Sequence, residues 1–479
     1  MQEIAKQLQS LLGPQGCLDN PNDIAAYTSD LLALKTAAPV CVVRPATTAQ
    51  VAAIVQCARK SKLAIIPQGG HTGLSGGAVA LNDRGEDNDN ENDSDGDSVI
   101  LSLDRMTAIR EIDTNDNVMI VEAGAVLANV QTAAREAGRI FPLSHGGEAS
   151  SQIGGNLSTN SGGNNALRYG TARDQVLGIE VVLPSGEIWN GLRRLRKNTA
   201  GYDLKHLFMG AEGTLGIITA AALKLRPAPS YRETAFVALA HPQAGLEFLR
   251  LLQSHVGEAV TAFELLSDTA ISAALTLSRV RFPLQTRYPW CALIEADTPS
   301  SHFDISGAIE EALSGALEGG MLLDAVIAQS ETQRDEFWHL RESIAFAMIE
   351  DKSALLSDTA VPVAKVAAFI SRAEAVILQI VPGARCVPFG HLGDGNIHFN
   401  VQRPEDMSGD TFKNHWPDLL DAIVKVSLSL GGTISAEHGI GRTKQRIFSK
   451  TSAEVELNLM RALKAAIDPD ELMNPGALF

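Results

Sequence analysis

The chain has little of several residue types and patterns that mark large classes of protein. Its 479 residues include five cysteines, which are scattered and never form a Cys-x-x-Cys pair (Cys17, Cys41, Cys57, Cys291, Cys386). This scarcity argues against a disulfide scaffold and against a thiolate metal site. No run of about 18 apolar residues could span a bilayer, and the first residues lack the apolar core of a signal peptide. We therefore expect a soluble, globular, cytoplasmic protein that is not an integral membrane protein.

Positive charge is also in short supply. The 40 lysines and arginines are outnumbered by 56 acidic residues, which gives a net charge of −16. Such a balance disfavours nucleic acid and an anionic membrane surface as partners. Residues 82–98 concentrate the acidic charge, with eight acids, one arginine and no aliphatic or aromatic side chain. We interpret this segment as a solvated, disordered loop. Calcium binding is the alternative, but an EF-hand pattern is absent.

Residues 391–400 (HLGDGNIHFN) combine a turn signal with a strand pattern. The Gly-Asp-Gly at their centre predicts a turn, and the alternation that follows predicts a strand with His398 and Asn400 on one face. Phe399 and Val401 should then pack behind. A single histidine is more often structural than functional, so His398 alone carries no argument.

A second polar segment, residues 435–441 (SAEHGIG), lies closer to the end of the chain. Its Glu437 can join His391 and His398 as the third ligand of a borderline metal such as zinc, which leaves one coordination position for a substrate. His438 is then a further imidazole for proton transfer. Three such residues in turn-rich contexts favour a site over three structural side chains.

Glycine is abundant in three other segments. Five glycines stand between Gly69 and Gly77, and glycine recurs with small polar side chains in residues 144–164 and 197–216. Because glycine lets backbone N–H groups approach a bulky anionic ligand, these segments predict a large heteroaromatic cofactor. Gly-Lys-Ser/Thr is missing, and residues 78–81 predict a strand where a nicotinamide-type Rossmann turn needs a helix. A structural turn is the alternative for residues 69–77.

Between these segments the pattern is one of mixed helices and strands. Apolar runs predict strands at 40–45, 63–67, 176–183 and 220–225, with a capped helix at 48–60. We expect an α+β cofactor domain that ends at the linker of residues 226–229. Beyond the linker, the sequence predicts short strands at 234–240, 291–296 and 385–389 and amphipathic helices at 418–430 and 453–466.

Four segments together resemble the flavin-binding segments of the vanillyl-alcohol oxidase / p-cresol methylhydroxylase (PCMH) flavoprotein superfamily: residues 67–77, 152–163, 210–216 and 474–476. With residues 391–400 and 435–441 included, the chain resembles the FAD-dependent D-2-hydroxy-acid dehydrogenases, of the D-2-hydroxyglutarate or D-lactate dehydrogenase type. This implies an α+β fold that begins with a two-subdomain PCMH-type FAD-binding domain (1–228, with the acidic insert 82–98). A ferredoxin-like antiparallel substrate (cap) domain with the metal site (229–424) and a small C-terminal helical part that returns to the flavin (425–479) would follow.

The resemblance also implies the roles of individual residues. His391, His398 and Glu437 match the ligands of a divalent metal, with Zn²⁺ expected before Mn²⁺, and His438 matches the catalytic base. Arg341 and Asn400 match substrate-binding residues, and the planar guanidinium of arginine suits a carboxylate. The implied FAD contacts are Pro67, Gly69, Gly70, His71, Thr72, Gly73, Gly76, Gly77, Gly154, Gly155, Asn156, Thr159, Asn160, Gly162, Gly213, Gly216, Ile217 and Asn474. Covalent attachment of the flavin to His71 is a less favoured alternative, because the register differs by one residue.

The activity implied by the resemblance is oxidation of a small D-2-hydroxy acid to the 2-oxo acid by hydride transfer to FAD. D-2-hydroxyglutarate is the leading substrate. D-lactate and glycolate are the alternatives, because Ala345 and Leu356 replace the threonine and lysine that usually serve the distal carboxylate. The electron acceptor is expected to be an electron-transfer flavoprotein, a quinone or a cytochrome, and a homodimer is an open alternative to a monomer. A nicotinamide enzyme and a non-catalytic metal-binding protein are the rival classes.

We predict that deleting residues 84–97 leaves stability and activity nearly unchanged. The segment contributes no apolar burial, and loop length changes the free energy of folding only slowly. The measurements are the midpoint of thermal unfolding and the rate of substrate oxidation, compared with the full-length chain. A large loss of activity or of acceptor reduction would show instead that the segment docks an electron acceptor.

Overall fold

The computed structural model describes residues 2–29, 34, 36–80, 98–277 and 279–479. Apart from Ser98, the acidic segment expected to be a disordered loop lies outside these residues. Contacts within the chain divide it into two compact units. The first unit comprises residues 1–161, 171–227 and 437–479, and the second comprises residues 162–170 and 228–436. Each unit is therefore built from stretches that are separated in the sequence.

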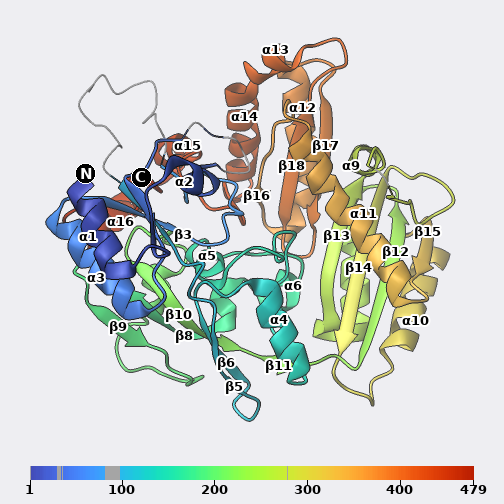
Figure 1. Cartoon of the computed structure of the whole chain (residues 1–479). Coiled ribbons are helices and arrows are strands. Elements are labelled where there is room, and N and C mark those ends of the chain that lie inside the picture. Colours follow the sequence, from blue (N-terminus) through green and yellow to red (C-terminus); the bar gives the residue numbers. More distant parts are fainter. Residues whose placement is uncertain (1, 30–33, 35, 81–97, 278) are drawn as a thin grey trace. The chain divides into compact units, whose positions relative to one another are not determined.

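Three sheets form the strand framework of the first unit (Figure 1). A four-stranded sheet has the order β1 (Cys17–Leu18), β2 (Cys41–Val43), β4 (Ser98–Ser102), β3 (Ala64–Gln68), with β2, β4 and β3 parallel. An antiparallel five-stranded sheet has the order β5 (Ile109–Asp113), β6 (Val118–Glu122), β10 (Ile217–Lys224), β8 (Val176–Val182), β9 (Ile188–Gly191). The third pairs β7 (Arg139–Ile140) with β11 (Arg226–Pro227).

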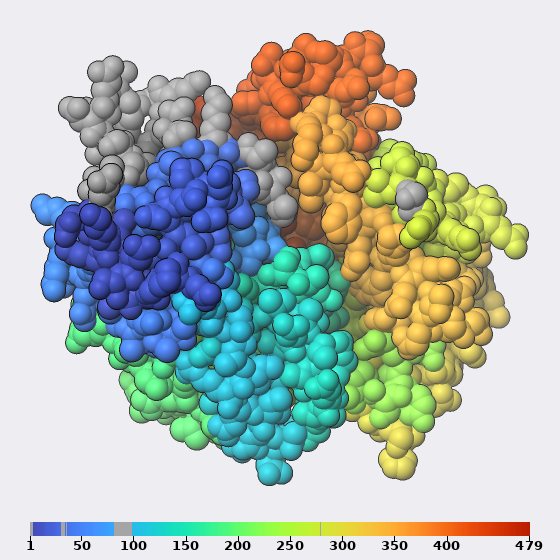
Figure 2. All heavy atoms as spheres, viewed as in Figure 1, coloured from blue at the N-terminus to red at the C-terminus, as the bar shows by residue number. Residues whose placement is uncertain are grey.

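Helices of the first unit share one apolar core with the two larger sheets. The core receives side chains from α1 (Gln2–Leu12), α3 (Thr48–Lys60), α4 (Leu127–Glu136) and α5 (Ile153–Ser158). Helix α3 begins where the sequence predicts, because the Thr47 side chain accepts a hydrogen bond from Gln50 N. Its blue residues and those of α1 lie together on the surface in Figure 2. The remaining helices are α2 (Pro21–Thr28), α7 (Lys205–Phe208), α15 (Gln445–Thr451), α16 (Glu454–Ile467) and the 3-10 turn η1 (Ala172–Gln175).

The end of the chain completes the parallel sheet of the first unit. Met473 forms a parallel bridge to Ile65 of β3. Ile65 N donates to Leu472 O at 2.9 Å, and Asn474 N donates to Ile65 O at 2.8 Å. This pairing satisfies the hydrogen-bonding groups of Ile65 on the outer edge of β3. The outer neighbour of a strand near the start of the sequence therefore comes from residues near its end.

Residues 78–80 do not form the strand that their apolar sequence predicts. Val79 and Ala80 are buried, but they lie in turn and coil. Ala80 O accepts a hydrogen bond from Ala37 N at 2.8 Å, outside any strand ladder. Burial alone accounts for the apolar pattern here, because a short apolar run indicates packing without specifying the backbone conformation.

One antiparallel seven-stranded sheet organises the second unit. Its order is β15 (Asp324–Ile327), β12 (Tyr231–Leu239), β14 (Trp290–Thr298), β13 (Val260–Ser267), β17 (Arg385–His391), β18 (Asn396–Gln402), β16 (Thr359–Ala360). Successive side chains of a strand point to opposite faces, so the sheet separates two apolar cores. Phe263 and Leu265 belong to one core, and Ala262 and Leu266 belong to the other.

The helices of the second unit divide between these two cores. One core receives α8 (Pro242–Val256), α10 (Ile305–Glu318), α12 (Val366–Ile380), α13 (Gly409–Lys413) and α14 (Trp416–Ser429). The other receives α9 (Asp268–Ala274) and α11 (Glu331–Glu350), and this second face of the sheet is called the α11 face below. Two 3-10 turns, η2 (Gly257–Ala259) and η3 (Val363–Lys365), complete the connections.

Residues 162–170 also belong to the second unit, although their sequence neighbours on both sides belong to the first. They include α6 (Ala166–Tyr169), whose Arg168 forms an ion pair with the buried Asp297 of β14. Leu167 lies against Gly393, where an added Cβ would come within 2.7 Å of Leu167 Cδ2. The turn between β17 and β18 therefore needs a residue without a side chain at this contact.

The α+β class predicted from the sequence is confirmed, and the predicted strands and helices other than residues 78–81 lie close to their expected positions. Residues 437–479 return to the first unit. The domain boundary expected near Val424 would fall inside α14. The division by contacts instead lies between Ala436 and Glu437. Among the residues that the structure describes, none of the helices has the length and apolar composition that a membrane span requires.

Candidate functional site

Five buried polar side chains gather on the α11 face of the seven-stranded sheet: Glu264 from β13, His391 from β17, His398 and Asn400 from β18, and Arg341 from α11. Each of them is at most 9% exposed. Phe399 and Val401 belong to the core on the opposite face. The alternation predicted for β18 is therefore confirmed, and it explains why two polar side chains of one strand point the same way.

Glu264 links two of these side chains. It is the direct cross-strand partner of His391, whose Nδ1 lies 2.6 Å from Glu264 Oε1. Arg341 Nε donates to Glu264 Oε2 at 2.8 Å, and Arg341 Nη2 lies 3.3 Å from His391 Nε2. Burial by itself would raise the pKa of Glu264, but the charges of His391 and Arg341 and their hydrogen bonds lower it to about 2. The carboxylate is therefore ionised, with the Arg341 guanidinium as its counter-charge.

The two predicted imidazole ligands lie beside each other. The ring centroids of His391 and His398 are 5.9 Å apart, with an interplanar angle of 73°. One ligand atom each of His391, His398 and Glu437 lies within 4.8 Å of the others. The structure thus brings together the three residues predicted as ligands, and two imidazoles with a carboxylate are a donor set that suits zinc.

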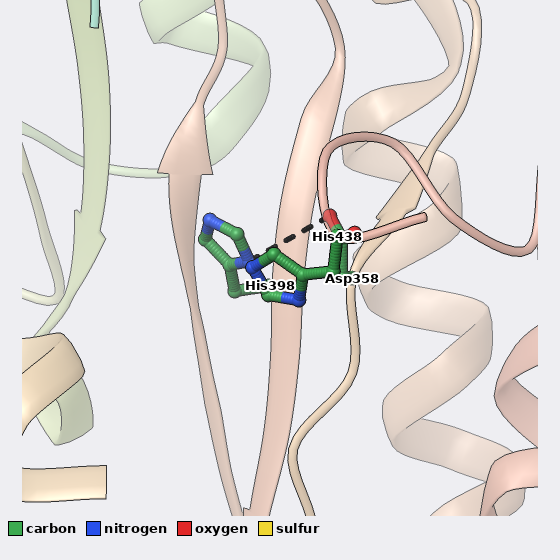
Figure 3. Close-up of side chains that lie close together, drawn as sticks. All are labelled: Asp358, His398 and His438. Atoms are coloured by element: carbon green, nitrogen blue, oxygen red, sulfur yellow. Dashed lines mark ion pairs between the residues drawn. The ribbon is translucent and has the colours of Figure 1, made fainter. Parts of the chain in front are cut away.

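A second group shares His398. One ligand atom each of Asp358, His398 and His438 lies within 4.8 Å of the others, and Figure 3 shows these three side chains together. The dashed line in Figure 3 marks the 4.0 Å contact between His398 Nδ1 and Asp358 Oδ1. The predicted base, His438, is therefore placed next to the predicted ligand His398.

Asp358 also holds the backbone that leads to Glu437 and His438. It is 2% exposed, and it accepts hydrogen bonds from Ser435 Oγ and from Ala436 N, each at 3.2 Å. A buried carboxylate needs such partners, because an unpaired charge in the interior is costly. Its contacts consequently fix the chain directly before the two predicted functional residues.

Glu212 plays the corresponding part directly after them. Its carboxylate accepts hydrogen bonds from Ile440 N and Gly441 N, each at 2.8 Å. Burial raises the pKa of Glu212, although these N–H groups act in the opposite direction. Gly439 has a φ of +71°, and a Cβ added there would meet Glu212 Oε1 at 2.8 Å. The segment after His438 therefore requires glycine.

Asn400, the predicted substrate-binding amide, has a fixed orientation. Its Oδ1 accepts a hydrogen bond from Ser357 N at 2.9 Å, and the side chain is 3% exposed. Since the oxygen is engaged by the backbone, the amide nitrogen is the group that can donate elsewhere.

In the first unit, the glycine-rich segments converge although they are distant in the sequence. A Cβ on Gly69 would lie 3.4 Å from Gly155 N, and one on Gly213 would lie 2.9 Å from Pro67 Cγ. Asn474 Nδ2 donates to Gly77 O at 2.9 Å and to Glu212 O at 2.7 Å. Residues 67–77, 154–155, 210–216 and 474 thus share one location.

Some predicted cofactor residues face open space, and others have structural contacts. A Cβ added at Gly73 or Gly155 would meet nothing within 4 Å, as expected where a ligand approaches the backbone. Asn160 Oδ1 instead accepts from Arg173 N and Thr171 Oγ1, each at 2.9 Å. Contacts of this kind hold the shape of the loop.

Gly162 belongs to the second unit, with the excursion of residues 162–170. His71 has a positive φ of 59°, a left-handed conformation that non-glycine residues seldom adopt.

Sequence reasoning missed Glu264, Asp358 and Glu212. Glu264 is the one charged residue in the otherwise apolar and hydroxyl-bearing strand β13, VTAFELLS. A lone acid in such a strand is a usable signal, because buried charges are paired. The partners of Asp358 and Glu212, which include backbone N–H groups, a hydroxyl and the Asn396 amide, lie far along the chain, where no local pattern reveals them.

Comparison with known proteins gives the family. Residues 39–191 match the FAD binding domain family, and residues 228–478 match the family of FAD linked oxidases, C-terminal domain. The chain is 35% identical to the D-2-hydroxyglutarate dehydrogenase of Stutzerimonas stutzeri, over 99% of this chain and 98% of the relative. It is 32% identical to the mitochondrial D-2-hydroxyglutarate dehydrogenase of Bos taurus, over 96% and 81%. A putative mitochondrial D-lactate dehydrogenase of Schizosaccharomyces pombe is 30% identical, over 98% and 88%.

Solved structures confirm the PCMH-type fold. p-Cresol methylhydroxylase with substrate bound superimposes with a TM-score of 0.75 at 15% identity, over 99% of this chain and 96% of that chain. Alkyldihydroxyacetonephosphate synthase gives a TM-score of 0.71 at 19% identity, over 99% and 84%. Both matches extend over nearly the whole of this chain. The chain therefore belongs to the FAD-linked oxidase family, and it is an FAD-dependent oxidoreductase that acts on 2-hydroxy acids.

Proposed function

We propose that this chain is a metal-dependent D-2-hydroxy-acid dehydrogenase in which His391, His398 and Glu437 hold Zn²⁺ or Mn²⁺. The observation that carries the proposal is the gathering of their ligand atoms within 4.8 Å of one another, next to Arg341. A dehydrogenase of this class needs a carboxylate-binding group, an anchor for the 2-oxygen and a proton acceptor. Arg341, the metal site and His438 supply them in turn.

Each side chain of the site has its own role in the proposed reaction. Arg341 uses Nε and Nη2 in its contacts with Glu264 and His391, so we assign Nη1 to the substrate carboxylate. Asn400 donates from its amide nitrogen, and His438 accepts the hydroxyl proton. A bound metal would make the substrate hydroxyl more acidic, and bound FAD would supply the hydride acceptor.

The side chain of the substrate meets an apolar surface. Ala345, one helical turn after Arg341, and Leu356 both pack against the core of the α11 face. Lys352 lies in the turn beyond the end of α11 and is exposed. Arg385 is the first residue of β17, about 20 Å along the strand from His391. Its side chain is exposed and forms an ion pair with Glu405. We therefore assign neither cation to a distal carboxylate.

Two substrates therefore remain as candidates. D-2-hydroxyglutarate is the leading one, supported by the names of the relatives at 32–35% identity. A monocarboxylate such as D-lactate is the second, and Ala345 and Leu356 favour it, because burying an unpaired distal carboxylate costs several kcal/mol.

The substrate is identified by kcat/KM for the D and L forms of 2-hydroxyglutarate and lactate. We expect reduction of the flavin by the D enantiomers, because three fixed contacts at C2 leave the hydrogen of the L enantiomer pointing away. A 2-hydroxyglutarate to lactate ratio near or below one would remove the dicarboxylate as the substrate. Rapid reduction by L-lactate would contradict the stereochemical assignment.

Replacing His438 by alanine should lower the rate of flavin reduction by roughly two to four orders of magnitude, the usual contribution of a positioned base. Substrate affinity should change much less. His339→Ala is the matched control, since this exposed histidine lies on the same helix as Arg341. Near-normal anaerobic reduction of the flavin in the His438 variant would rule out its role as the base.

Removal of the metal by a chelator should abolish substrate-driven bleaching while the bound-flavin spectrum persists. The proposed ligands lie outside the glycine-rich segments, so FAD does not depend on them. Added Zn²⁺ or Mn²⁺ should restore bleaching. Release of FAD on chelation would mean that the metal supports the cofactor site instead.

We also propose that FAD lies against the converging glycine-rich segments, at the positions given above. Asn474→Ala should lower the ratio of flavin to protein, because Asn474 joins Gly77, Glu212 and Arg442 through hydrogen bonds of 2.7 to 2.9 Å. Asn458→Ala, on the exposed side of α16, is the control. Full FAD occupancy in the Asn474 variant would place the cofactor elsewhere.

Reoxidation of the flavin requires an acceptor, for which we propose an electron-transfer flavoprotein, a quinone or a cytochrome.

All five cysteines are free thiols. This supports a reducing compartment.

A further inference from the structure

Glu264 is the feature of the second unit that the proposed roles leave unused. It is 1% exposed, it carries a charge, and it touches both the proposed metal ligand His391 and the proposed carboxylate-binding residue Arg341. Buried charges are rare unless they are paired or functional. A carboxylate that joins the two ends of a candidate site therefore calls for an explanation.

The contact with His391 selects the nitrogen that can serve the metal. Glu264 and His391 face each other directly across β13 and β17, so their side chains leave the sheet side by side. His391 Nδ1 lies 2.6 Å from Glu264 Oε1, a distance at which the carboxylate oxygen can accept the Nδ1 proton. This hydrogen bond favours the tautomer that leaves the lone pair of Nε2 for a metal. Metal-ligating histidines commonly have such a carboxylate on the other nitrogen.

The contact with Arg341 fixes the plane of the guanidinium. Arg341 Nε donates to Glu264 Oε2 at 2.8 Å, while the ring of Phe389 lies under the guanidinium at 5.5 Å from its centroid. The Nε edge of the guanidinium is thereby held against the sheet. One terminal nitrogen, Nη2, is turned toward His391, and it lies 3.3 Å from His391 Nε2. Without Glu264, a buried guanidinium would lose its counter-charge and its orientation.

Helix α11 has a second anchor that looks similar but lies away from the site. Glu295 of β14, 4% exposed, accepts from Arg334 Nε at 2.8 Å and from Trp338 Nε1 at 3.0 Å. Arg334 precedes Arg341 by seven positions, about 10 Å along the helix. Both carboxylates tie α11 to the sheet, but Glu264 alone of the two touches a proposed ligand.

We propose that Glu264 is a positioning residue which sets His391 for the metal and Arg341 for the substrate carboxylate at the same time. The inference rests on the proposed function. One carboxylate, through its two oxygens, fixes the distance between the place of the metal and the place of the carboxylate. That distance must match the separation of the 2-oxygen and the carboxylate within a 2-hydroxy acid.

The test compares Glu264→Gln with Glu295→Gln in the FAD-loaded protein. The Kd for Zn²⁺ is measured by competition with a chromophoric chelator, so the readout does not depend on turnover. Glu264→Gln should weaken Zn²⁺ binding roughly 10- to 100-fold, the usual effect of losing a carboxylate partner of a ligating histidine. The glutamine amide of this variant can either donate to or accept from His391 Nδ1. The substituted side chain therefore no longer favours the tautomer with the proton on Nδ1. Glu295→Gln should leave the Kd unchanged, although it removes an equally buried carboxylate.

Two further measurements separate positioning from loss of structure. Cobalt(II) in place of zinc should show a shifted visible spectrum in Glu264→Gln and an unshifted one in Glu295→Gln. KM for the substrate should rise in the Glu264 variant because Arg341 is no longer held. Glu264→Asp keeps the charge but is one methylene shorter, and it should recover part of the metal affinity. If Glu264→Gln does not fold, the Asp variant is compared with Glu295→Asp by the same measurements.

The outcomes are distinguishable. Metal binding by the wild type together with an unchanged Kd and cobalt spectrum in the Glu264 variants would overturn the positioning role and leave the proposed function standing. Equal losses in the Glu264 and Glu295 variants would also overturn it, since the effect would then be structural. A wild type that binds neither Zn²⁺ nor Mn²⁺ would overturn the metal part of the proposed function and this inference with it.

Discussion

A negative charge enclosed by protein is the constraint from which the arrangement of the second unit follows. Glu264 stands in a central strand of the seven-stranded sheet, where water does not reach it. An isolated carboxylate in such a place would take up a proton or prevent folding. It is ionised here because Arg341 comes from α11 and His391 comes from the neighbouring strand. The helix, the sheet and the polar cluster are thus joined at one point.

A second constraint acts on the backbone around Glu437 and His438. Asp358 holds the residues before them, and Glu212 holds the residues after them. Both anchors are buried carboxylates that accept hydrogen bonds from backbone N–H groups. The two proposed functional residues consequently occupy a short stretch whose ends are fixed, in keeping with the need for a metal ligand and a base to be preorganised.

The sequence predicted correctly those parts of the fold that depend on residues close to one another in the chain. The capped helix after Thr47 and the alternation around His398 are confirmed, because capping and alternation are settled by residues within a few positions. The strand expected at residues 78–81 is wrong for the described residues 78–80, because burial produced their apolar pattern without strand pairing. The three proposed metal ligands were expected to share a site from their residue types and turn-rich contexts, and their ligand atoms lie within 4.8 Å of one another. The cross-strand neighbour Glu264 and the excursion of residues 162–170 depend on register and on distant contacts, which periodicity does not encode.

The pairing of Met473 with Ile65 has a consequence for the order in which the protein is made. Synthesis proceeds from the N-terminus, and early domains generally begin to fold as soon as they emerge. Strand β3 appears early but lacks its outer neighbour until residues 472–474 have left the ribosome. The second unit, by contrast, has all of its residues available by Ala436. The later-encoded unit can therefore finish first, while the unit that begins the chain waits with an open sheet edge for its own C-terminus.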